Sequence, residues 1–372
     1  MSATSQTGPI VVYAATGYTG TLISEELVRR GAAFTIAGRS REKLERLADS
    51  LDASPGVAAV SNDDPAGLRN LFADAGAVIT CAGPFCKHGT PVVEAAAEVG
   101  AHYLDTAGEQ PFIASCFDRH DEAAKASGAA LVSGMGFDYA PGDMLAALTA
   151  EGMGRLDELT VAYAVSGFTP TRGTALSAID MVSDGGVEWV AGHYRQAPRN
   201  ASRGHFPFPE PIGERRVGRY PAGEQITVPR HVEVKQVRTL IDIKGLLGGL
   251  PTGPLGGTLM TASGLLMDTP LATISRKIVE RLPEGPSPEN REQARYTLVC
   301  DVRGPQGRRR GILRGADIYG ITAKTTTEGA LRMASEGFER SGALAPAEAF
   351  DPAEFLEALA PAGISYELGP TS

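Results

Sequence analysis

The stretch that most constrains the fold lies near the N-terminus, where an apolar run passes into a small-residue loop and then into a helix. Residues Ile10–Tyr13 predict a buried strand, and residues 14–20 read A-A-T-G-Y-T-G. A strand, a tight turn and a helix in this order make a pyrophosphate site, because the free N–H groups and the positive dipole of the helix N-terminus face the anion. The residues predicted to contact the pyrophosphate are Ala15, Thr16, Gly17, Tyr18, Thr19 and Gly20.

Each glycine of this loop has a predicted purpose. Gly17 would let the backbone approach the phosphates, and Gly20 would let the helix pack closely on the strand. Ala14 replaces the usual first glycine, so the motif reads A-x-x-G-x-x-G. Taken alone, this pattern also fits a tight turn between a strand and a helix that binds no ligand. The second half of the fingerprint is needed to choose between these interpretations.

That second half follows the next apolar run, residues 34–37, where the sequence reads Gly38-Arg39-Ser40. An NAD-binding unit places an aspartate or glutamate near this point, where it binds the ribose hydroxyls. Here no acid is present, and the guanidinium of Arg39 offers a planar fork of donors suited to phosphate oxygens. We therefore predict that Arg39 and Ser40 bind the 2′-phosphate of NADP(H). The alternative is that Arg39 only caps a surface loop.

Composition limits the classes of protein to consider. The chain has 372 residues, which suggests two domains, and 42% of them are hydrophobic, as in an ordinary globular protein. Its net charge of −9 argues against a general binder of nucleic acid or acidic membranes. The four cysteines lack C-x-x-C spacing, so we expect no zinc site, no disulfide framework and a cytoplasmic location. We also expect no signal segment and no metal, since no His, Cys or Asp cluster has ligand spacing.

From the first strand to Val132, short apolar runs alternate with amphipathic segments. This rhythm predicts the α/β class, a Rossmann doubly wound parallel sheet with helices on both faces, over residues 1–140. One helix is expected to begin at Pro91 and to stop at Gly100, which is the usual order of these two residues. The six predicted strands are 10–13, 34–37, 57–60, 77–80, 102–105 and 129–132.

Beyond Pro141 the rhythm changes, which predicts an α+β substrate domain over residues 141–324. We expect strands at 159–165, 296–302 and 311–318, with a turn at Gly304–Gly307 between the last two. Residues 173–182 read as a helix, and the proline-rich residues 197–229 read as a loop-rich region. Residues 325–372 are predicted to form a C-terminal helical segment that begins with a helix at 325–341.

Three segments follow predicted strands of the first domain, where ligands of such sheets bind. They are Cys81–Phe85, Asp105–Glu109 and Ser133–Tyr139, and all are rich in small residues that leave room for a flat nicotinamide. Each could instead be an ordinary turn, in which glycine is common for backbone reasons. The residues predicted to contact the cofactor here are Cys81, Ala82, Gly83, Pro84, Asp105 and Gly108.

The apolar region Leu246–Leu266 carries no charge, but several glycines and prolines interrupt it. No continuous membrane-spanning helix would contain so many of them, so we expect no transmembrane segment. A mobile substrate loop that leads into a helix is the favoured interpretation. A buried core segment and a membrane-surface contact are the alternatives.

Several of these segments together resemble the saccharopine dehydrogenase-like reductases, and in particular the bacterial branch that includes the trans-acting enoyl reductases. The resemblance implies a Rossmann domain, an inserted α+β domain, a C-terminal segment that returns to the first domain, NADP(H) and a homodimer. It does not fix the substrate, because members reduce imines or enoyl double bonds. The matching segments are 14–20, 37–40, 81–85, 102–109, 136–138 and 342–350.

Hydride transfer needs proximity, orientation and one proton donor. No tyrosine is followed four residues later by lysine, which excludes the catalytic pair of short-chain dehydrogenases. His88 and Tyr139 are the candidate proton donors, while a structural hydrogen bond is the alternative for each. Asp105 and Glu109 are expected to order the loop or bind the ribose, and Asp138 to cap the following helix.

These observations lead to a first hypothesis, a reductase that uses NADPH to reduce a C=C or C=N bond of a small or carrier-linked metabolite. A second hypothesis is a non-catalytic NADP(H) sensor, because the T-G-Y-T-G loop also suits such proteins. A large inserted domain favours the enzyme. A lipid-surface protein that uses residues 246–266 is the weakest of the three hypotheses.

Overall fold

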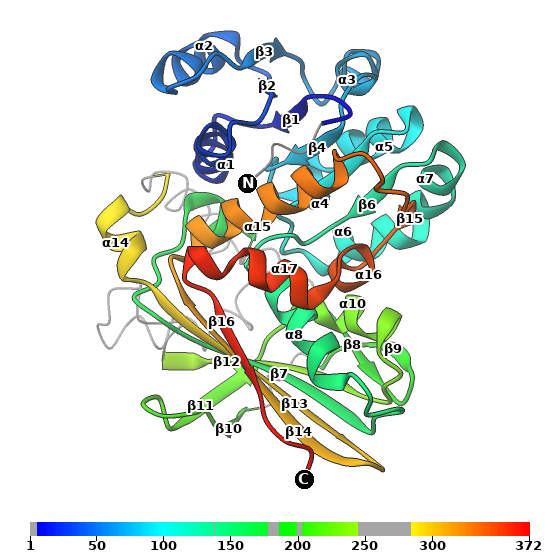
Figure 1. Cartoon of the computed structure of the whole chain (residues 1–372), viewed down its shortest axis with the longest axis vertical. Helices are drawn as coiled ribbons and strands as arrows, with labels where there is room; N and C mark the ends of the chain where they lie inside the picture. Colours follow the sequence, from blue (N-terminus) through cyan, green and yellow to red (C-terminus); the bar gives the residue numbers. More distant parts are fainter. Residues whose placement is uncertain (1–5, 138, 178–185, 199–202, 245–283) are drawn as a thin grey trace, which may run out of the picture. The chain divides into compact units, whose positions relative to one another are not determined.

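The computed structural model describes residues 6–137, 139–177, 186–198, 203–244 and 284–372 (Figure 1). The chain divides into two compact units. The first contains Met1–Ala140 and Tyr319–Asp351, and the second contains Pro141–Ile318 and Pro352–Ser372. The predicted substrate loop Leu246–Leu266 and the predicted helix cap Asp138 lie outside the described residues.

The first unit is built on a parallel sheet with the strand order β15-β6-β5-β4-β1-β2-β3. Ile10 of β1 lies opposite Phe34 of β2 on one side and opposite Ala77 of β4 on the other. The sheet grows outward from β1 in both directions, which confirms the predicted Rossmann fold. The strands are β1 (Ile10–Tyr13), β2 (Phe34–Gly38), β3 (Gly56–Ala59), β4 (Ala77–Thr80), β5 (His102–Asp105), β6 (Ala130–Val132) and β15 (Gly342–Ala343).

Helices connect these strands, and their ends follow the local sequence. The predicted helix at 91–100 is α5, with Pro91 in its first turn and Gly100 in the left-handed conformation at its end, φ 80°. The apolar residues of β1 are almost fully buried and form the centre of the core. The helices up to β6 are α1 (Tyr18–Arg29), α2 (Arg41–Ser50), α3 (Pro65–Phe72), α4 (Phe85–His88), α5 (Thr90–Val99), α6 (Gln110–Ser115), a π-helical turn (Cys116–His120) and α7 (Asp121–Ser127).

The helix predicted at 325–341 was placed too late in the chain. Helix α15 spans Ile318–Met333 and therefore begins where the sequence pattern suggested the end of a strand. Asp317 has φ 57°, a left-handed conformation that breaks the strand and lets the helix start at the next residue. An aspartate just before an apolar periodic segment is a helix start signal, and the prediction overlooked it.

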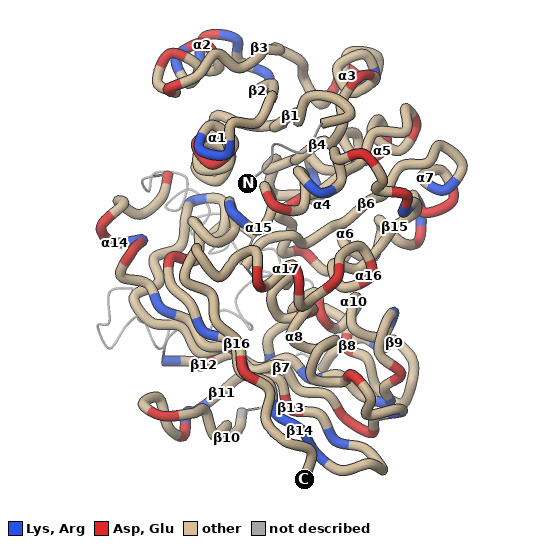
Figure 2. The backbone as a smooth tube through the Cα atoms, in the orientation of Figure 1, with Lys and Arg blue, Asp and Glu red and all other residues tan. Residues whose placement is uncertain are grey.

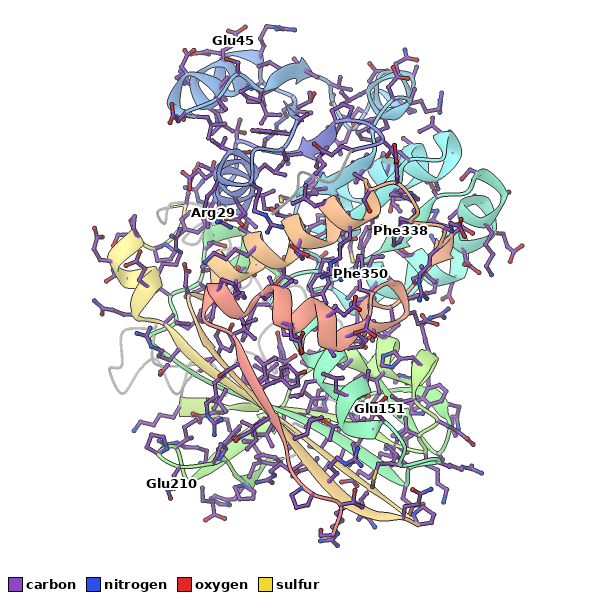
Figure 3. The ribbon with its side chains drawn as sticks, viewed as in Figure 1. Arg29, Glu45, Glu151, Glu210, Phe338 and Phe350 are labelled. Atoms are coloured by element: carbon purple, nitrogen blue, oxygen red, sulfur yellow. The ribbon has the colours of Figure 1, made fainter. Side chains whose placement is uncertain are left out.

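After α15 the chain stays on the first unit for a short segment. The ring of Phe338 lies 5.1 Å from that of His102 and 6.1 Å from that of Phe350, measured between centroids (Figure 3). Strand β15 then pairs with β6, with Gly342 opposite Ala130, and α16 (Pro346–Ala349) follows. Apolar rings and one short strand pairing thus bring residues from near the C-terminus to the edge of the first sheet.

The second unit contains a mixed sheet with the order β10-β11-β12-β7-β13-β14-β16, in which only β12 and β7 are parallel neighbours. The predicted hairpin is confirmed and is longer than expected, because β13 and β14 pair down to Gly304 and Gly307. A separate two-stranded sheet joins β8 and β9. The strands are β7 (Glu158–Ser166), β8 (Val187–Val190), β9 (His193–Gln196), β10 (Arg203–Pro207), β11 (Glu214–Arg219), β12 (Val237–Asp242), β13 (Arg295–Gly304), β14 (Gly307–Ala316) and β16 (Ser365–Leu368).

The prediction that residues 197–229 form a loop-rich region was wrong. The region contains the strands β10 and β11 and the helix α10. The prolines that suggested a loop occupy positions that regular structure tolerates, since Pro207 ends the edge strand β10 and Pro221 precedes α10. The helices of this unit are α8 (Ala140–Ala150), α10 (Glu224–His231), α14 (Pro288–Gln293), α17 (Pro352–Ala358) and a 3₁₀ turn (Ala360–Ala362), and residues 172–177 are also helical.

The mixed sheet curls around its own apolar residues. Ala162, Leu240 and Val299 are buried in one cluster with Phe206 and Phe208, which come from β10 and the loop after it. Arg310 of β14 donates a hydrogen bond of 3.0 Å to the carbonyl oxygen of Pro207, although four strands lie between β14 and β10 in the sheet order. The edge strand β10 therefore approaches β14 across the concave face.

The last part of the chain differs from the expected C-terminal segment. We expected residues 325–372 to stay with the first domain, but Pro352–Ser372 belong to the second unit. The reason is β16, which pairs with β14 and places Tyr366 opposite Leu313. No helix among the described residues has both the length and the apolar content needed to cross a bilayer.

Candidate cofactor site

The predicted site residues follow strands that are neighbours in the first sheet. Strands β6, β5, β4, β1 and β2 are adjacent and parallel, so their carboxyl ends share one edge (Figure 1). The loops after these strands supply the predicted site residues. Ala15–Gly20 follow β1, Arg39 and Ser40 follow β2, Cys81–Pro84 and His88 follow β4, Asp105 ends β5 with Gly108 just beyond it, and Tyr139 follows β6.

The loop after β1 turns at Ala14, which has φ 60°. This is the left-handed conformation that the usual glycine adopts easily and that alanine adopts only with strain. The N–H of Gly17 donates a hydrogen bond of 3.2 Å to the carbonyl oxygen of Ala14 and closes the turn. The replacement of glycine by alanine has therefore kept the shape of the loop.

The two glycines of the motif have different surroundings. A Cβ atom added at Gly20 would lie 2.7 Å from the Ala14 carbonyl oxygen and 2.8 Å from the Ala15 Cα, so packing of helix on strand requires glycine there. A Cβ added at Gly17 would meet only the Ala14 carbonyl oxygen, at 3.6 Å, and the φ of Gly17 is −82°. Neither backbone conformation nor protein packing requires a glycine at position 17. The space above it is open to a ligand.

Hydrogen-bond donors around this space are unused. Helix α1 begins after Gly17 without a side-chain hydrogen bond to its first N–H groups. The hydroxyls of Thr16 and Thr19 are partly exposed and have no hydrogen-bond partner among the residues that the structure describes. Free N–H groups, two hydroxyls and the positive end of a helix dipole suit an anion such as a pyrophosphate.

Arg39 extends this set of donors at the end of β2. Its side chain is exposed and forms no ion pair or hydrogen bond with any described residue. Ser40 caps α2, where its Oγ accepts a hydrogen bond of 3.4 Å from the N–H of Lys43. An Oγ that accepts in this way still has its own proton to donate. Both side chains are thus compatible with their predicted role as ligands of a phosphate.

The loop after β4 is small and partly exposed, and its cysteine is unreactive. Burial raises the pKa of the Cys81 thiol to about 12, so it carries no thiolate at neutral pH. Gly83 is exposed, and a Cβ there would make only ordinary contacts with the ring of Phe85. His88 ends α4, is exposed, and has no side-chain partner among the described residues.

The loops after β5 and β6 use their polar groups to hold one another. The Oδ1 atom of Asp105 accepts hydrogen bonds of 2.9 Å from the N–H of Ala107, the Oγ of Ser133 and the N–H of Gly134. Asp105 is fully buried. Through Oδ1 the carboxylate joins the ends of β5 and β6, whereas its Oδ2 has no hydrogen-bond partner among the described residues. A role of Asp105 in cofactor binding stays a prediction.

Burial in this position also disturbs the titration of Asp105. Removal of the carboxylate from water raises its pKa to about 6, even though the hydrogen bonds from Gly134, Ala107 and Ser133 oppose the shift. The Oε2 of Glu109, at the end of the same loop, accepts a hydrogen bond of 3.0 Å from the N–H of Cys86 and so links the loop after β5 to α4, the helix that follows the loop after β4.

Tyr139 is buried, and its hydroxyl donates a hydrogen bond of 2.5 Å to the carbonyl oxygen of Gly108. This bond is the structural alternative that the sequence left open for Tyr139, and it does not support the predicted role in proton donation. The carbonyl of Gly108 is occupied by the same bond. Of the two predicted proton donors, His88 has the more available side chain.

Sequence reasoning missed the contribution of α15. Tyr319 at its start lies with its ring 5.3 Å from that of Tyr18, the first residue of α1. The Oγ1 of Thr322 accepts a hydrogen bond of 3.0 Å from the N–H of Phe137, in the loop after β6. Arg30 and Glu328 form an ion pair at 2.6 Å that holds the far ends of α1 and α15 together. A correct start for this helix would have placed Tyr319 and Thr322 on it, but the contacts themselves join residues far apart in the chain.

Comparison with known proteins agrees with a dinucleotide-binding role for the first unit. Residues 10–132 match the family model described as the saccharopine dehydrogenase NADP binding domain, which confirms the predicted resemblance. A putative trans-acting enoyl reductase of Mycobacterium tuberculosis is 35% identical over 149 residues, which make up 39% of this chain and 36% of that protein. A saccharopine dehydrogenase-like oxidoreductase of Mus musculus is 32% identical over 152 residues, 36% of this chain and 35% of the other.

The matched region thus spans little more than a third of the length of these relatives. The solved structure of a saccharopine dehydrogenase (L-Glu forming) from Saccharomyces cerevisiae covers 98% of this chain and 100% of its own, with a TM-score of 0.57 and 13% identity. At that identity the likeness shows the fold, a Rossmann-like unit and a second mixed-sheet unit, and nothing of the reaction.

Proposed function

We propose that this chain, in which residues 10–132 match the saccharopine dehydrogenase NADP binding domain, is an NADP(H)-dependent oxidoreductase that reduces a C=C or C=N bond. The observation that carries the proposal is the set of unused donors at the ends of β1 and β2. Thr16, Thr19 and Arg39 have no side-chain partner among the described residues, and the space above Gly17 is open. Such a set suits a dinucleotide with an additional ribose phosphate.

In this proposal the residues of the chain bind and orient the cofactor. The N-terminus of α1 with Thr16 and Thr19 binds the pyrophosphate, and Arg39 with Ser40 binds the 2′-phosphate. Residues 81–84 leave room for the nicotinamide, because their side chains are small. NADPH, when bound, supplies a hydride to the acceptor. Asp105 and Glu109 act indirectly: their hydrogen bonds hold the segments after β4, β5 and β6 in place around the cofactor.

Reduction of an enoyl or imine group also requires a proton, and we propose that a ring nitrogen of His88 delivers it. The side chain is exposed and unpaired among the described residues, on the helix that follows the proposed nicotinamide loop. His88→Gln should lower turnover by roughly 100-fold, the lower range for loss of a general acid, with NADPH affinity unchanged. His193→Gln, at an exposed histidine of β9, is the matched control. Full turnover of His88→Gln would exclude this histidine.

Binding of the two coenzymes tests the proposal directly. Purified protein titrated with NADPH and NADH, followed by cofactor fluorescence, should bind NADPH at least tenfold more tightly. Equal affinity would reject the assignment of the 2′-phosphate site. Oxidation of NADPH in the presence of enoyl thioesters or cyclic imines then separates an enoyl reductase from an imine reductase, and no turnover with either class would remove the proposed reaction.

The oligomeric state and the cellular location of the protein are also part of the proposal. We propose a homodimer that acts in the cytoplasm on a small or carrier-linked metabolite. The four cysteines form no disulfides, as suits a reducing compartment. Two of the similar proteins are named as a putative trans-acting enoyl reductase and a saccharopine dehydrogenase-like oxidoreductase, which supports the type of chemistry.

A further inference from the structure

The hairpin of β13 and β14 differs in charge from the chain around it. Residues 295–316 contain six arginines and one aspartate, a net charge of +5, whereas the whole chain carries −9. Figure 2 shows this concentration of blue on β13 and β14. A basic element in an acidic protein attracts a local anionic partner, and the field of the whole protein repels long polyanions such as nucleic acid.

Four of the six arginines are held by the protein itself. Arg310 donates two hydrogen bonds of 2.6 Å to Asp301 and lies over the ring of Phe206. Arg309 donates to the Thr371 hydroxyl and to the Glu151 carbonyl oxygen, and Arg314 pairs with Glu367 at 2.7 Å. Arg295 donates to nearby carbonyl oxygens. These side chains stabilise the hairpin and are not available to a partner.

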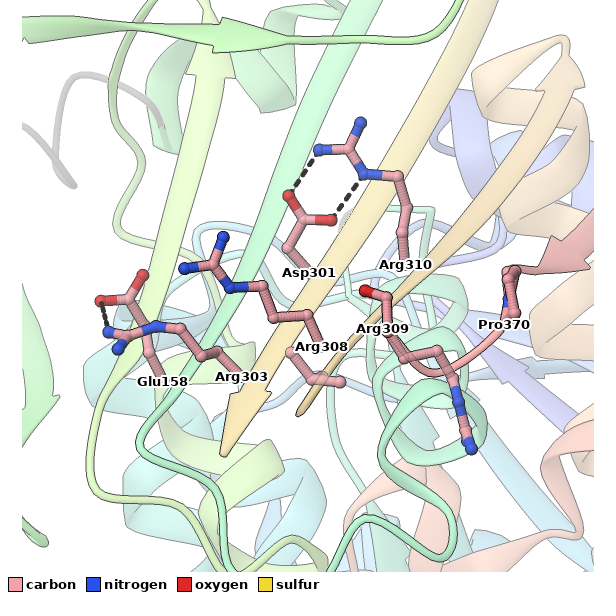
Figure 4. A pocket seen from close by; sticks show the side chains of 10 residues that line it. Glu158, Asp301, Arg303, Arg308, Arg309, Arg310 and Pro370 are labelled. Carbon is pink, nitrogen blue, oxygen red and sulfur yellow. Dashed lines mark hydrogen bonds and ion pairs between the residues drawn. The ribbon is translucent and has the colours of Figure 1, made fainter. Parts of the chain in front are cut away.

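The other two, Arg303 and Arg308, are in a different situation. They lie directly opposite one another in the register of the hairpin, so two like charges face each other across neighbouring strands. Like charges directly opposite one another on neighbouring strands are destabilising. Arg308 has no side-chain partner among the described residues, and Arg303 reaches Glu158 only at 3.8 Å. Figure 4 shows these two side chains beside each other, with Arg309 turned away.

Glu158 is shared with a third arginine. Arg238 of β12 approaches it at 3.7 Å, and both Arg238 and Arg303 have about half of their side chains exposed, 44% and 51%. Arg238 and Arg303 thus share Glu158 at distances of 3.7 and 3.8 Å, and Arg303 is also influenced by the charge of Asp157. Arg303 and Arg308 also line a hollow of about 570 Å³ with Glu158, Asp301 and Pro370 (Figure 4).

We propose that Arg238, Arg303 and Arg308 form a docking surface for an acidic helix of a partner protein. Arg303 and Arg308 lie on neighbouring strands, about 4.8 Å apart, which is close to the spacing of about 5.4 Å between successive turns of a helix. Arg238 lies two strands from Arg303, because β7 separates β12 from β13. The guanidinium fork pairs well with carboxylates. The three arginines belong to β12, β13 and β14, so the basic surface extends over more than one pair of strands. The proposal concerns the second unit alone and does not depend on the cofactor.

A labelled peptide tests this surface on the full-length chain. The probe is a fluorescein-labelled helical peptide with glutamate at every fourth position, and its control is the same peptide with glutamine at those positions. Fluorescence anisotropy at 20 mM NaCl should show binding of the glutamate peptide only. The double variant Arg303→Gln/Arg308→Gln should weaken this binding at least tenfold, while Arg46→Gln/Arg69→Gln, which removes two exposed arginines of the first unit, should change it less than twofold.

Other outcomes overturn the proposal. Equal binding of both peptides, or of the glutamate peptide by wild type and the Arg303/Arg308 variant, would show that the arginines do not form the surface. Binding of inorganic pyrophosphate in place of the peptide, lost in the same variant, would replace it with a phosphate site. The variant removes mutual repulsion between exposed residues and should unfold no earlier than wild type. Its NADPH affinity should be unchanged, which separates this test from that of the cofactor site.

Discussion

The loops after β1 and β2 and the loops after β5 and β6 lie at the same edge of one sheet, yet they treat their polar groups in opposite ways. The first pair leaves donors unused, with Arg39 and Thr16 unpaired among the described residues. In the second pair, polar groups form hydrogen bonds within the protein: Asp105 accepts three hydrogen bonds, and the Tyr139 hydroxyl donates one to the Gly108 carbonyl oxygen. The loops after β1, β5 and β6 are all rich in small residues, and this feature alone does not tell them apart.

This difference distinguishes loops that are available to bind a ligand from loops that stabilise the protein structure. Buried polar groups are almost always paired within the protein, whereas a ligand site keeps exposed donors in reserve. The first pair of loops is therefore the proposed place of phosphate binding, and the second pair fixes the shape of the neighbouring edge. Substitutions in the two pairs should then have different consequences: loss of affinity in one and change of stability in the other.

The largest expected effect is on affinity, from Gly17→Val. The conformation of Gly17 suits valine, and its Cβ would enter the open space where the pyrophosphate is proposed to lie. Loss of two charge-assisted hydrogen bonds should weaken NADPH binding roughly 100-fold or more, with the unfolding temperature preserved. Gly20→Ala is the matched variant. Its Cβ would clash with backbone atoms and should lower the free energy of unfolding by about 2 kcal/mol. Unchanged affinity of Gly17→Val would reject the role of the loop.

Asp105→Asn should change stability in a pH-dependent way. The folded carboxyl has its pKa raised to about 6 from 3.8, chiefly by burial. Its contribution to stability is fully present below the unfolded pKa and is lost as pH rises through about 6, by up to about 3 kcal/mol. The asparagine variant keeps an acceptor oxygen and should lack this decline, so it should be more stable than wild type at pH 8. Urea unfolding at pH 5 and pH 8 measures the difference, and parallel profiles would contradict it.

Arg39→Ala should affect one coenzyme and not the other. Loss of a guanidinium that binds the 2′-phosphate should weaken NADPH binding by about 2 kcal/mol, or about 30-fold, with NADH affinity within about threefold of wild type. Arg46→Ala removes an exposed arginine of α2 that pairs with Glu42, and it should leave both affinities unchanged. Isothermal titration with both coenzymes decides the matter. An equal loss for the two would place Arg39 outside the phosphate site.

The smallest expected effect comes from Tyr139→Phe. The variant keeps the buried ring and removes only the hydrogen bond to the Gly108 carbonyl, which should lower the free energy of unfolding by about 1 kcal/mol. NADPH affinity and turnover should stay within about twofold of wild type. A large fall in turnover at full cofactor affinity would instead restore Tyr139 as a proton donor and would break the distinction between the two pairs of loops.

The fold of the first unit was largely predictable because its signals are local. The six predicted strands agree with the structure to within one residue at each end. In the second unit the local sequence pattern gave a wrong prediction, because prolines such as the one at the end of β10 made residues 197–229 look like a loop. Helix α15 was misplaced because the change from strand to helix occurs at one residue, Asp317, in a conformation that few residue types adopt.

The sequence by itself determined the Rossmann unit, the loop with its two glycines and the absence of an acid near Arg39, because periodicity and turn chemistry act over a few neighbouring residues. Only the tertiary structure decided which polar groups are left for a ligand. Asp105 and Arg39 both lie at ends of strands of the sheet. The carboxylate of Asp105 accepts hydrogen bonds from Ser133 and Gly134 at another strand end, whereas the guanidinium of Arg39 forms no hydrogen bond or ion pair with a described residue. Pairing of this kind depends on residues far apart in the chain, and no local pattern encodes it.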